Sequence, residues 1–268
     1  MTRQLLSLRT RARGFTLIEL LVALGISMLL TIIIAEVFIQ TRRSYMVQDD
    51  QARVQENTRF IMQSISRVVR QTGFRSYVGV ASSVYFPYAT APAIKGTEGG
   101  GTLSDSLVVR FQGSGGSNGT SDNSMFDCLG NTVAYGNTSA NYFSLQSGAD
   151  GNGLACSLDN STWTELVPGV ENMQILYGVD TDADRTANYY ARASDIADTM
   201  LDSIVSARFS LLVRSPTETF PTAQSVTYTM NGITVGNNPS ASASATPFTD
   251  RRVRRVVEFT VNLRNRTP

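Results

Sequence analysis

The sequence predicts an α+β protein in which one long N-terminal helix precedes a β-rich head with a mainly antiparallel sheet. Residues 15–72 contain no proline and a single glycine, Gly25, and Gly73 then follows as a typical helix-ending residue. Beyond Gly73 the apolar residues recur at every second position, which indicates strands with one buried face. These strands follow one another without a regular helix between them, and such runs favour antiparallel pairing.

The helix divides into two halves of different polarity. Residues 15–38 are almost wholly apolar, with no charge from Leu20 to Ala35, and are long enough to cross a membrane. Residues 39–73 are amphipathic. Four apolar side chains of this second half share one helix face and are expected to pack on a sheet: Val54, Ile61, Ile65 and Val68.

Residues 74–268 are expected to form the head. Strands are predicted at 107–111, 173–177, 207–213, 226–230 and 257–263. A short helix is predicted at 194–201, with Ser194 or Asp195 as its N-cap. Three segments rich in Gly, Ser, Asn and Ala are expected to be loops that either contact a partner or merely connect strands: 96–101, 113–124 and 237–246.

The composition excludes several kinds of active site. The 268 residues include 23 basic and 22 acidic residues but no histidine. Catalytic Ser-His-Asp and Cys-His pairs and histidine metal sites are therefore impossible. No other nucleophile stands beside a base in a recognisable pattern, so no enzymatic activity is expected.

The N-terminus combines a basic leader with an acid placed inside the apolar segment. Residues 1–14 carry four arginines and no acid, and the apolar run begins at Phe15, directly after Gly14. Glu19 lies five residues into that run. A charge within a membrane helix costs up to about 3 kcal/mol, so it usually has a partner.

The stretch Gly14-Phe15-Thr16-Leu17-Ile18-Glu19 resembles the class III signal of type IV pilins and type II secretion pseudopilins. The resemblance implies that residues 1–14 are a leader, that prepilin peptidase cuts between Gly14 and Phe15, and that Phe15 becomes N-methylated. It also implies that Glu19 faces the terminal ammonium of a neighbouring subunit. An ordinary secretory signal would instead be cut after its apolar core. A plain signal anchor is the other alternative, and it has no evident need of Glu19.

The charge distribution predicts the orientation in the membrane. The leader arginines favour a cytoplasmic N-terminus and a periplasmic head. Their removal leaves 19 basic and 22 acidic residues, a net charge of about −3, with no basic footprint for nucleic acid. In the periplasm Cys128 and Cys156, the two cysteines of the chain, are expected to form a disulfide. Free buried thiols or a metal site are the alternatives.

The amphipathic helix and the head resemble the PilW family of type IV pilus minor pilins. The resemblance covers nearly the whole chain. Its motifs are Asn57–Phe60 (NTRF), Val69–Phe74 (VRQTGF), Val167–Gln174 (VPGVENMQ), Tyr177–Asp182 (YGVDTD), Ser206–Ser215 (SARFSLLVRS) and Phe259–Asn265 (FTVNLRN).

This resemblance implies a type IV pilin-like fold and a minor pilin that joins other minor pilins in a complex that primes pilus assembly. The complex would sit at the pilus tip, adjoin the major pilin, carry a large adhesin and support twitching or adhesion. The protein would be an inner-membrane protein before assembly and part of the surface pilus afterwards. The alternatives are a type II secretion pseudopilin similar to pseudopilin J, and a membrane-anchored periplasmic binding or sensor module.

One acidic segment is a candidate calcium site, the single cofactor that the sequence suggests. Asp180, Asp182 and Asp184 alternate as they do in calcium loops. The EF-hand pattern, however, requires glycine where the chain has Arg185 and glutamate where it has Ala191. The alternative is an acidic hairpin turn, because aspartate is common in turns.

Overall fold

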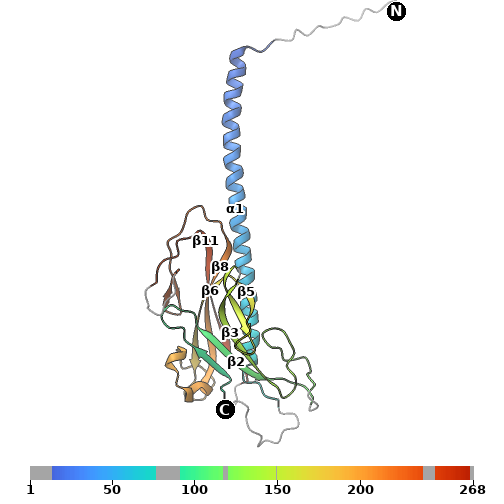
Figure 1. Cartoon of the computed structure of the whole chain (residues 1–268). Coiled ribbons are helices and arrows are strands. Elements are labelled where there is room, and N and C mark those ends of the chain that lie inside the picture. Colours follow the sequence, from blue (N-terminus) through green and yellow to red (C-terminus); the bar gives the residue numbers. More distant parts are fainter. Residues whose placement is uncertain (1–13, 77–90, 117–119, 149, 238–244, 266–268) are drawn as a thin grey trace, which may run out of the picture. The chain divides into compact units, whose positions relative to one another are not determined.

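The computed structural model describes residues 14–76, 91–116, 120–148, 150–237 and 245–265 (Figure 1). The chain divides into two compact units, Met1–Met46 and Val47–Pro268. One helix, α1, runs from Leu17 to Gln71. It ends where Gly73 adopts a left-handed φ of 78°, which confirms the predicted stop.

In the first unit every described side chain is exposed. The most apolar 18-residue window of α1 has a mean hydropathy of 2.7 and none of it is buried. By length and composition the helix can cross a membrane, although a signal sequence passes the same test. The predicted leader lies outside the described residues except for Gly14.

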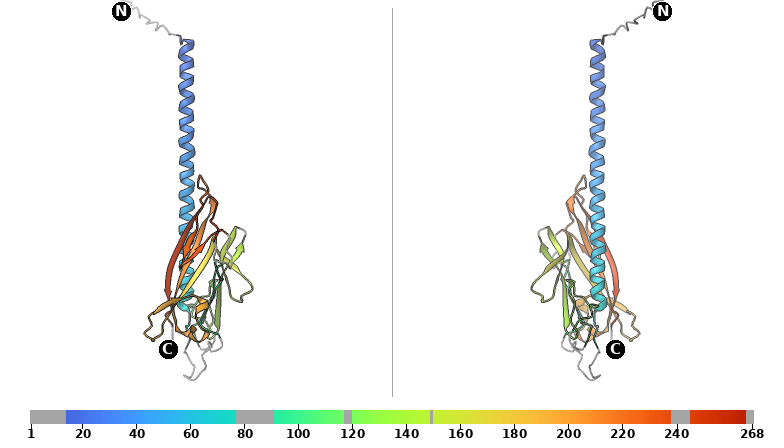
Figure 2. Two further views of the ribbon diagram at one scale, coloured as in Figure 1. Left: turned by 90° about the vertical axis from the view of Figure 1, so that its left-hand side faces the viewer. Right: turned by 90° about the vertical axis from the view of Figure 1, so that its right-hand side faces the viewer.

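In the second unit the remainder of α1 lies along the sheets (Figures 1 and 2). Its buried apolar face comprises the four predicted residues Val54, Ile61, Ile65 and Val68, together with Val69. These side chains join the inner faces of both large sheets in one hydrophobic core. The amphipathic face therefore packs on the sheet as predicted.

A five-stranded antiparallel sheet forms one side of this core. Its strands follow chain order, β1-β2-β3-β4-β5. Alternate residues of β2 (Leu107, Val109 and Phe111) point into the core, which confirms the strand predicted there. The strand bounds are β1 Ile94–Thr97, β2 Ser106–Gln112, β3 Thr138–Gly148, β4 Gly151–Ser157 and β5 Thr164–Pro168.

A four-stranded antiparallel sheet, in the order β11-β8-β6-β7, forms the other side. Strand β6 is buried on nearly both faces, as predicted for residues 173–177. A separate hairpin of β9 and β10 packs on β8 through the contacts of Leu212 with Met230, Val235 and Phe248. The bounds are β6 Val170–Val179, β7 Tyr189–Ala191, β8 Ile204–Glu218, β9 Tyr228–Met230, β10 Ile233–Val235 and β11 Arg252–Asn262.

Three sequence predictions need correction. Residues 194–201 do not form one helix; they belong to two 3-10 turns, η1 Ala193–Asp195 and η2 Asp198–Ser203, separated by an extended Ile196. The hydroxyl of Ser194 donates to the carboxylate of Asp195, so neither side chain caps a helix. The predicted strand at 226–230 is shorter, because Val226 makes only an isolated bridge to Phe248.

The third correction concerns the predicted loop at 96–101. Gly96 and Thr97 belong to β1, where they pair with Leu107 and Ser106. Glycine is needed at position 96 because a side chain there would collide with the buried ring of Tyr177. In the other two predicted loops, residues 117–119 and 238–244 lie outside the described residues.

The segment Thr102–Asp105 joins the two sheets by covering an edge of β6. The N–H of Ile175 and the N–H of Gly99 both donate to the carboxylate of Asp105, at 2.8 and 3.0 Å. The N–H of Asp105 in turn donates to the carbonyl of Met173. Backbone groups that an edge strand would leave unpaired are thereby satisfied.

Candidate functional site

The candidate assembly site lies at the first turn of α1, where Thr16 and Glu19 form a reciprocal cap. The N–H and the hydroxyl of Thr16 both donate to the Glu19 carboxylate at 2.9 Å, and the N–H of Glu19 donates to the Thr16 hydroxyl at 3.3 Å. This is a capping box, with threonine at the N-cap and glutamate three residues later. It explains why the helix begins at Leu17 rather than at Phe15.

The predicted cleavage point is accessible in the structure. Gly14 and Phe15 precede the helix in a segment without regular secondary structure, and Phe15 is 88% exposed. A peptide bond outside regular structure can adopt the extended form that a peptidase needs. Cleavage there and N-methylation of Phe15 remain predictions.

Glu19 has no cationic partner among the described residues. Its hydrogen bonds go to Thr16 alone, and none of the ion pairs of the described chain includes it. The capping box satisfies hydrogen-bonding groups but leaves the negative charge uncompensated. An incoming ammonium is the chemical complement of such a group in an apolar setting.

The structure pairs Cys128 with Cys156, the bridge that the sequence favours, with Cα atoms 6.3 Å apart. Cys156 lies in β4 and is fully buried, whereas Cys128 lies in the segment before β3. The N–H of Cys128 donates to the buried side chain of Asn141 at 2.7 Å, and Arg67 of α1 reaches the carbonyl of Asp127. The disulfide therefore links an irregular segment to the sheet, and the Arg67 hydrogen bond links the same segment to α1.

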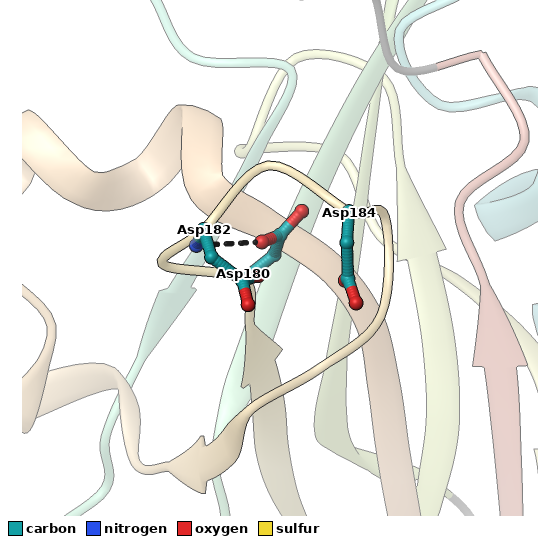
Figure 3. A group of neighbouring side chains, drawn as sticks. All are labelled: Asp180, Asp182 and Asp184. Carbon is teal, nitrogen blue, oxygen red and sulfur yellow. Dashed lines mark hydrogen bonds between the residues drawn. The ribbon is translucent and has the colours of Figure 1, made fainter.

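The candidate calcium loop lies between β6 and β7 (Figure 3). One carboxylate oxygen from each of Asp180, Asp182 and Asp184 can be found within 4.8 Å of the others, but only Asp180 is buried. The Asp180 carboxylate accepts the N–H groups of Asp182, Ala183 and Arg185 at 2.8–3.1 Å. Burial alone would raise its pKa, but these three donors outweigh burial and lower it. The Asp180 carboxylate therefore stabilises a tight acidic turn through hydrogen bonds to the backbone.

Two polar arrangements were not foreseen from the sequence. Asp50 of α1 is 3% exposed, and its carboxylate accepts the hydroxyls of Thr217 and Thr219 at 2.7–3.0 Å. A polar residue in a polar stretch gives no sign that it will be buried against residues 167 positions later. Because a buried acid is costly unless hydrogen-bonded, these hydroxyls hold the helix in register with the end of β8.

The second unforeseen arrangement surrounds Arg254 of β11. Its guanidinium pairs with Glu171 and Asp250 at 2.6 Å and lies 3.9 Å from the ring centre of Phe248. Burial disfavours its charge, but the two carboxylates outweigh burial and raise its pKa above the usual value. Glu171 also pairs with Arg214 at 3.5 Å. The T-x-x-E capping box could have been read from the sequence, whereas these long-range pairs had no local signal.

Comparison with known families decides what this architecture is. Residues 142–265, from within β3 to just beyond β11, match the family described as type IV pilus-assembly protein W, PilW. Residues 9–35 match the prokaryotic N-terminal methylation motif, which includes Gly14, Phe15 and Glu19. The chain is a minor pilin of the PilW family. Its long apolar helix and antiparallel head make up a type IV pilin-like fold.

Similarity to individual proteins is lower. The type IV-like pilin TTHA1219 from Thermus thermophilus matches with 13% identity and a TM-score of 0.45, over 82% of this chain and 97% of that one. No curated protein sequence matches the chain significantly. As a pilin with a methylation motif and an apolar helix, this PilW protein is a membrane-anchored subunit that later enters the pilus, which implies processing by prepilin peptidase and contact with other pilins.

Proposed function

We propose that this protein joins other minor pilins in a complex that primes assembly of the type IV pilus and sits at its tip. The observation that carries the proposal is the uncompensated carboxylate of Glu19 in an apolar helix of a PilW-family chain. Such a carboxylate favours association with a subunit that places a positive charge beside it in the same apolar environment.

The proposed partner of Glu19 is the N-terminal ammonium of an adjacent pilin. Opposite charges attract far more strongly in an apolar layer than in water, and either charge alone is penalised there. Pairing would therefore fix the axial stagger between neighbouring helices. The N-terminal ammonium of a pilin becomes available at the start of its helix only after the leader is cleaved. Cleavage between Gly14 and Phe15 would therefore be required before this chain could offer its own ammonium for assembly.

The proposed topology follows from the same segment. The leader would stay in the cytoplasm, α1 would cross the inner membrane, and the head would fold in the periplasm, where the Cys128–Cys156 bridge can form. After assembly the head would be displayed at the cell surface. The proposed neighbours are the other minor pilins, the major pilin and a large tip adhesin.

A pseudopilin similar to pseudopilin J is the nearest alternative, and the PilW match over residues 142–265 favours the pilus instead. A membrane-anchored sensor is less consistent with the methylation motif, because an anchor does not need a processed N-terminus.

Deletion of the gene and complementation with a tagged chain test the proposal. We expect surface pili per cell to fall sharply, and the tagged protein to co-purify with other minor pilins from solubilised membranes. Normal piliation in the deletion strain, or recovery of the tagged protein without any other pilin, would reject the priming role. Loss of secretion with normal pili would assign the chain to a pseudopilus.

A further inference from the structure

The outer face of the five-stranded sheet carries a small pocket that the pilin architecture does not explain. It has a volume of about 170 Å³ and is bounded by β1, β2, β3 and the β4–β5 connection. The side chains that give it its chemistry are Thr97, Ser106, Tyr142, Ser144, Asn160 and Trp163.

Tyr142 of β3 is one of the aromatic residues that line this pocket. Its neighbours in β3, Asn141 and Phe143, are buried, so strand alternation directs Tyr142 to the opposite, outer face. It pairs across the sheet with Val108 of β2 and Ser157 of β4. The ring is thus held at the middle of a sheet, where its backbone is fixed on both sides.

A second aromatic residue of the pocket, Trp163, belongs to the tightly folded connection between β4 and β5. The carboxylate of Asp159 accepts the N–H groups of Ser161 and Thr162 and the hydroxyls of Ser157 and Thr162, all within 2.7–3.0 Å. Hydrogen bonds from Thr162 and Ser161 hold the pKa of this carboxyl well below its usual value. The carboxylate therefore stays charged, and keeps these hydrogen bonds, across the physiological pH range.

This hydrogen-bonded turn contains Asn160 and is followed directly by Trp163. Asn160 adopts a left-handed φ of 60°, and Trp163 follows as the last residue before β5. A preformed wall lowers the entropy that a ligand must offset on binding.

Several polar groups of the pocket make no hydrogen bond within the described residues, although the Ser144 hydroxyl donates to the carbonyl of Leu145 at 3.4 Å. Among the described residues none forms a hydrogen bond with the Tyr142 hydroxyl, the Trp163 indole or the side-chain amide of Asn160. The ring pairs of the described chain are Phe209–Phe259 and Tyr228–Phe248, so neither pocket ring is stacked on another. Aromatic side chains and several polar side chains therefore line one small pocket.

The pocket also lacks charge, which narrows the class of ligand. None of its described lining residues is acidic or basic. A charged ligand would lose its hydration without gaining a counter-charge there. A ligand that combines an apolar ring face with several neutral hydroxyl groups would match both the aromatic walls and the hydroxyl and amide groups.

We propose that this pocket binds one ring of a neutral sugar, with the ring face against Trp163 or Tyr142 and its hydroxyls against Asn160 and the serine and threonine side chains. The inference is independent of the position of the protein in the pilus, because it concerns the head alone. A single ring in a shallow site predicts weak binding, with a Kd on the order of 1 mM.

The sole tryptophan of the chain makes the test direct, since Trp163 is the reporter and the proposed contact at once. The full chain, in a detergent without a sugar headgroup, would be titrated with the methyl glycosides of glucose, galactose, mannose and N-acetylglucosamine. We expect a saturable change in tryptophan emission with at least one of them. Sorbitol, which has hydroxyls but no ring face, and glucuronate, which is charged, should give none.

Variants locate the site. Tyr142→Ala should raise the Kd at least about tenfold, and Asn160→Gly, which removes the side-chain amide but tolerates the left-handed φ of this exposed turn, should raise it several-fold. Tyr189→Ala, which removes an exposed ring on β7 of the other sheet, is the matched control and should leave binding unchanged. Far-ultraviolet circular dichroism would show that each variant is folded.

Two results would overturn the proposal. One is the absence of a saturable change with all four glycosides up to about 100 mM. The other is binding that prefers glucuronate or sorbitol, or that folded Tyr142→Ala and Asn160→Gly variants retain at full strength.

Discussion

The Glu19 carboxylate accepts two hydrogen bonds from Thr16, both 2.9 Å long, and so closes the first turn of its own helix. From the sequence alone, a plain anchor had no evident need of this acid. The capping box gives Glu19 a local task in any isolated chain. Replacing Glu19 with alanine would therefore disturb both the cap and the proposed pairing with a neighbouring ammonium.

Glutamine at position 19 separates these two tasks. Glu19→Gln keeps an acceptor oxygen for the cap, since glutamine also serves in capping boxes, but removes the charge. If pairing drives assembly, Glu19→Gln should reduce surface pili and co-purification with other minor pilins nearly as much as Glu19→Ala. Both variants should still insert into the membrane, because loss of the charge lowers the cost of insertion.

Thr16→Val is the matched control. It removes the hydroxyl of the cap and keeps the charge of Glu19, at a cost to the helix of about 1 kcal/mol. We expect near-normal piliation from this variant. The pairing mechanism would be contradicted by normal pili with Glu19→Gln and defective pili with Thr16→Val.

Processing is the second prediction. In cells with active prepilin peptidase, the intact mass of the purified chain should correspond to a protein that begins at Phe15 and carries one added methyl group. Gly14→Leu should block cleavage, because a bulky side chain would occupy the position beside the scissile bond. A chain that still begins at Met1 in such cells would remove the basis of the assembly mechanism.

Local regularities account for what could be predicted from the sequence. The absence of proline before Gly73 predicted α1 to within two residues at each end, and the spacing of Val54, Ile61, Ile65 and Val68 identified its buried face. Period-two alternation located β2, β6, β8 and β11, but strands β1, β3, β4 and β5 of the five-stranded sheet were not predicted. Each of these features depends on neighbours within one or two turns of helix or along a single strand.

The unpredicted features depend on partners far along the chain. Gly96 looked like a loop residue but lies in β1, because only glycine leaves room for Tyr177. The burial of Asp50 depends on Thr217, and that of Arg254 depends on Glu171. Periodicity alone does not reveal which sheet edge or helix face will meet such a residue.

The disulfide provides the third prediction. Removing the bridge between Cys128 and Cys156 with a double alanine variant should lower the free energy of unfolding by roughly 3–4 kcal/mol, because the bridge restricts a loop of 29 residues in the unfolded chain. Urea unfolding of the full chain in detergent would measure this difference. A loss of less than about 1 kcal/mol would show that the segment around Cys128 is held by its other contacts, such as the one with Asn141.

The acidic turn provides the fourth prediction. Because Asp180 accepts three backbone N–H groups, Asp180→Ala should lower the melting temperature both with calcium and with a chelator. Asp182→Ala and Asp184→Ala, whose side chains are exposed, should change it little in either condition. A rise in the wild-type melting temperature on adding calcium, lost in all three variants, would instead identify a calcium site.

The last prediction concerns pH and depends on Asp105, which joins the β1–β2 connection to β6. Burial raises the pKa of this carboxyl to about 6, despite the N–H donors Gly99 and Ile175. Burial also raises the pKa of the neighbouring Glu98. The folded pKa of Asp105 thus lies above the unfolded value, so the folded state binds more protons between those two values. Its contribution to stability is therefore full below about pH 4 and is lost as the pH rises through about 6.

We accordingly expect the free energy of unfolding to fall as the pH rises, mainly between about pH 4 and 6, with Asp105 responsible for a total change on the order of 3 kcal/mol. Asp105→Asn cannot titrate, and its amide keeps one acceptor for the N–H of Ile175 or Gly99. Whatever the absolute stability of this variant, its free energy of unfolding should change less with pH across this window than that of the wild type. Glu258→Gln, on the exposed face of β11, is the control and should preserve the wild-type slope. Parallel curves for the wild type and Asp105→Asn would show that Asp105 stays ionised in the folded protein, and that its hydrogen bonds to Gly99 and Ile175 outweigh its burial.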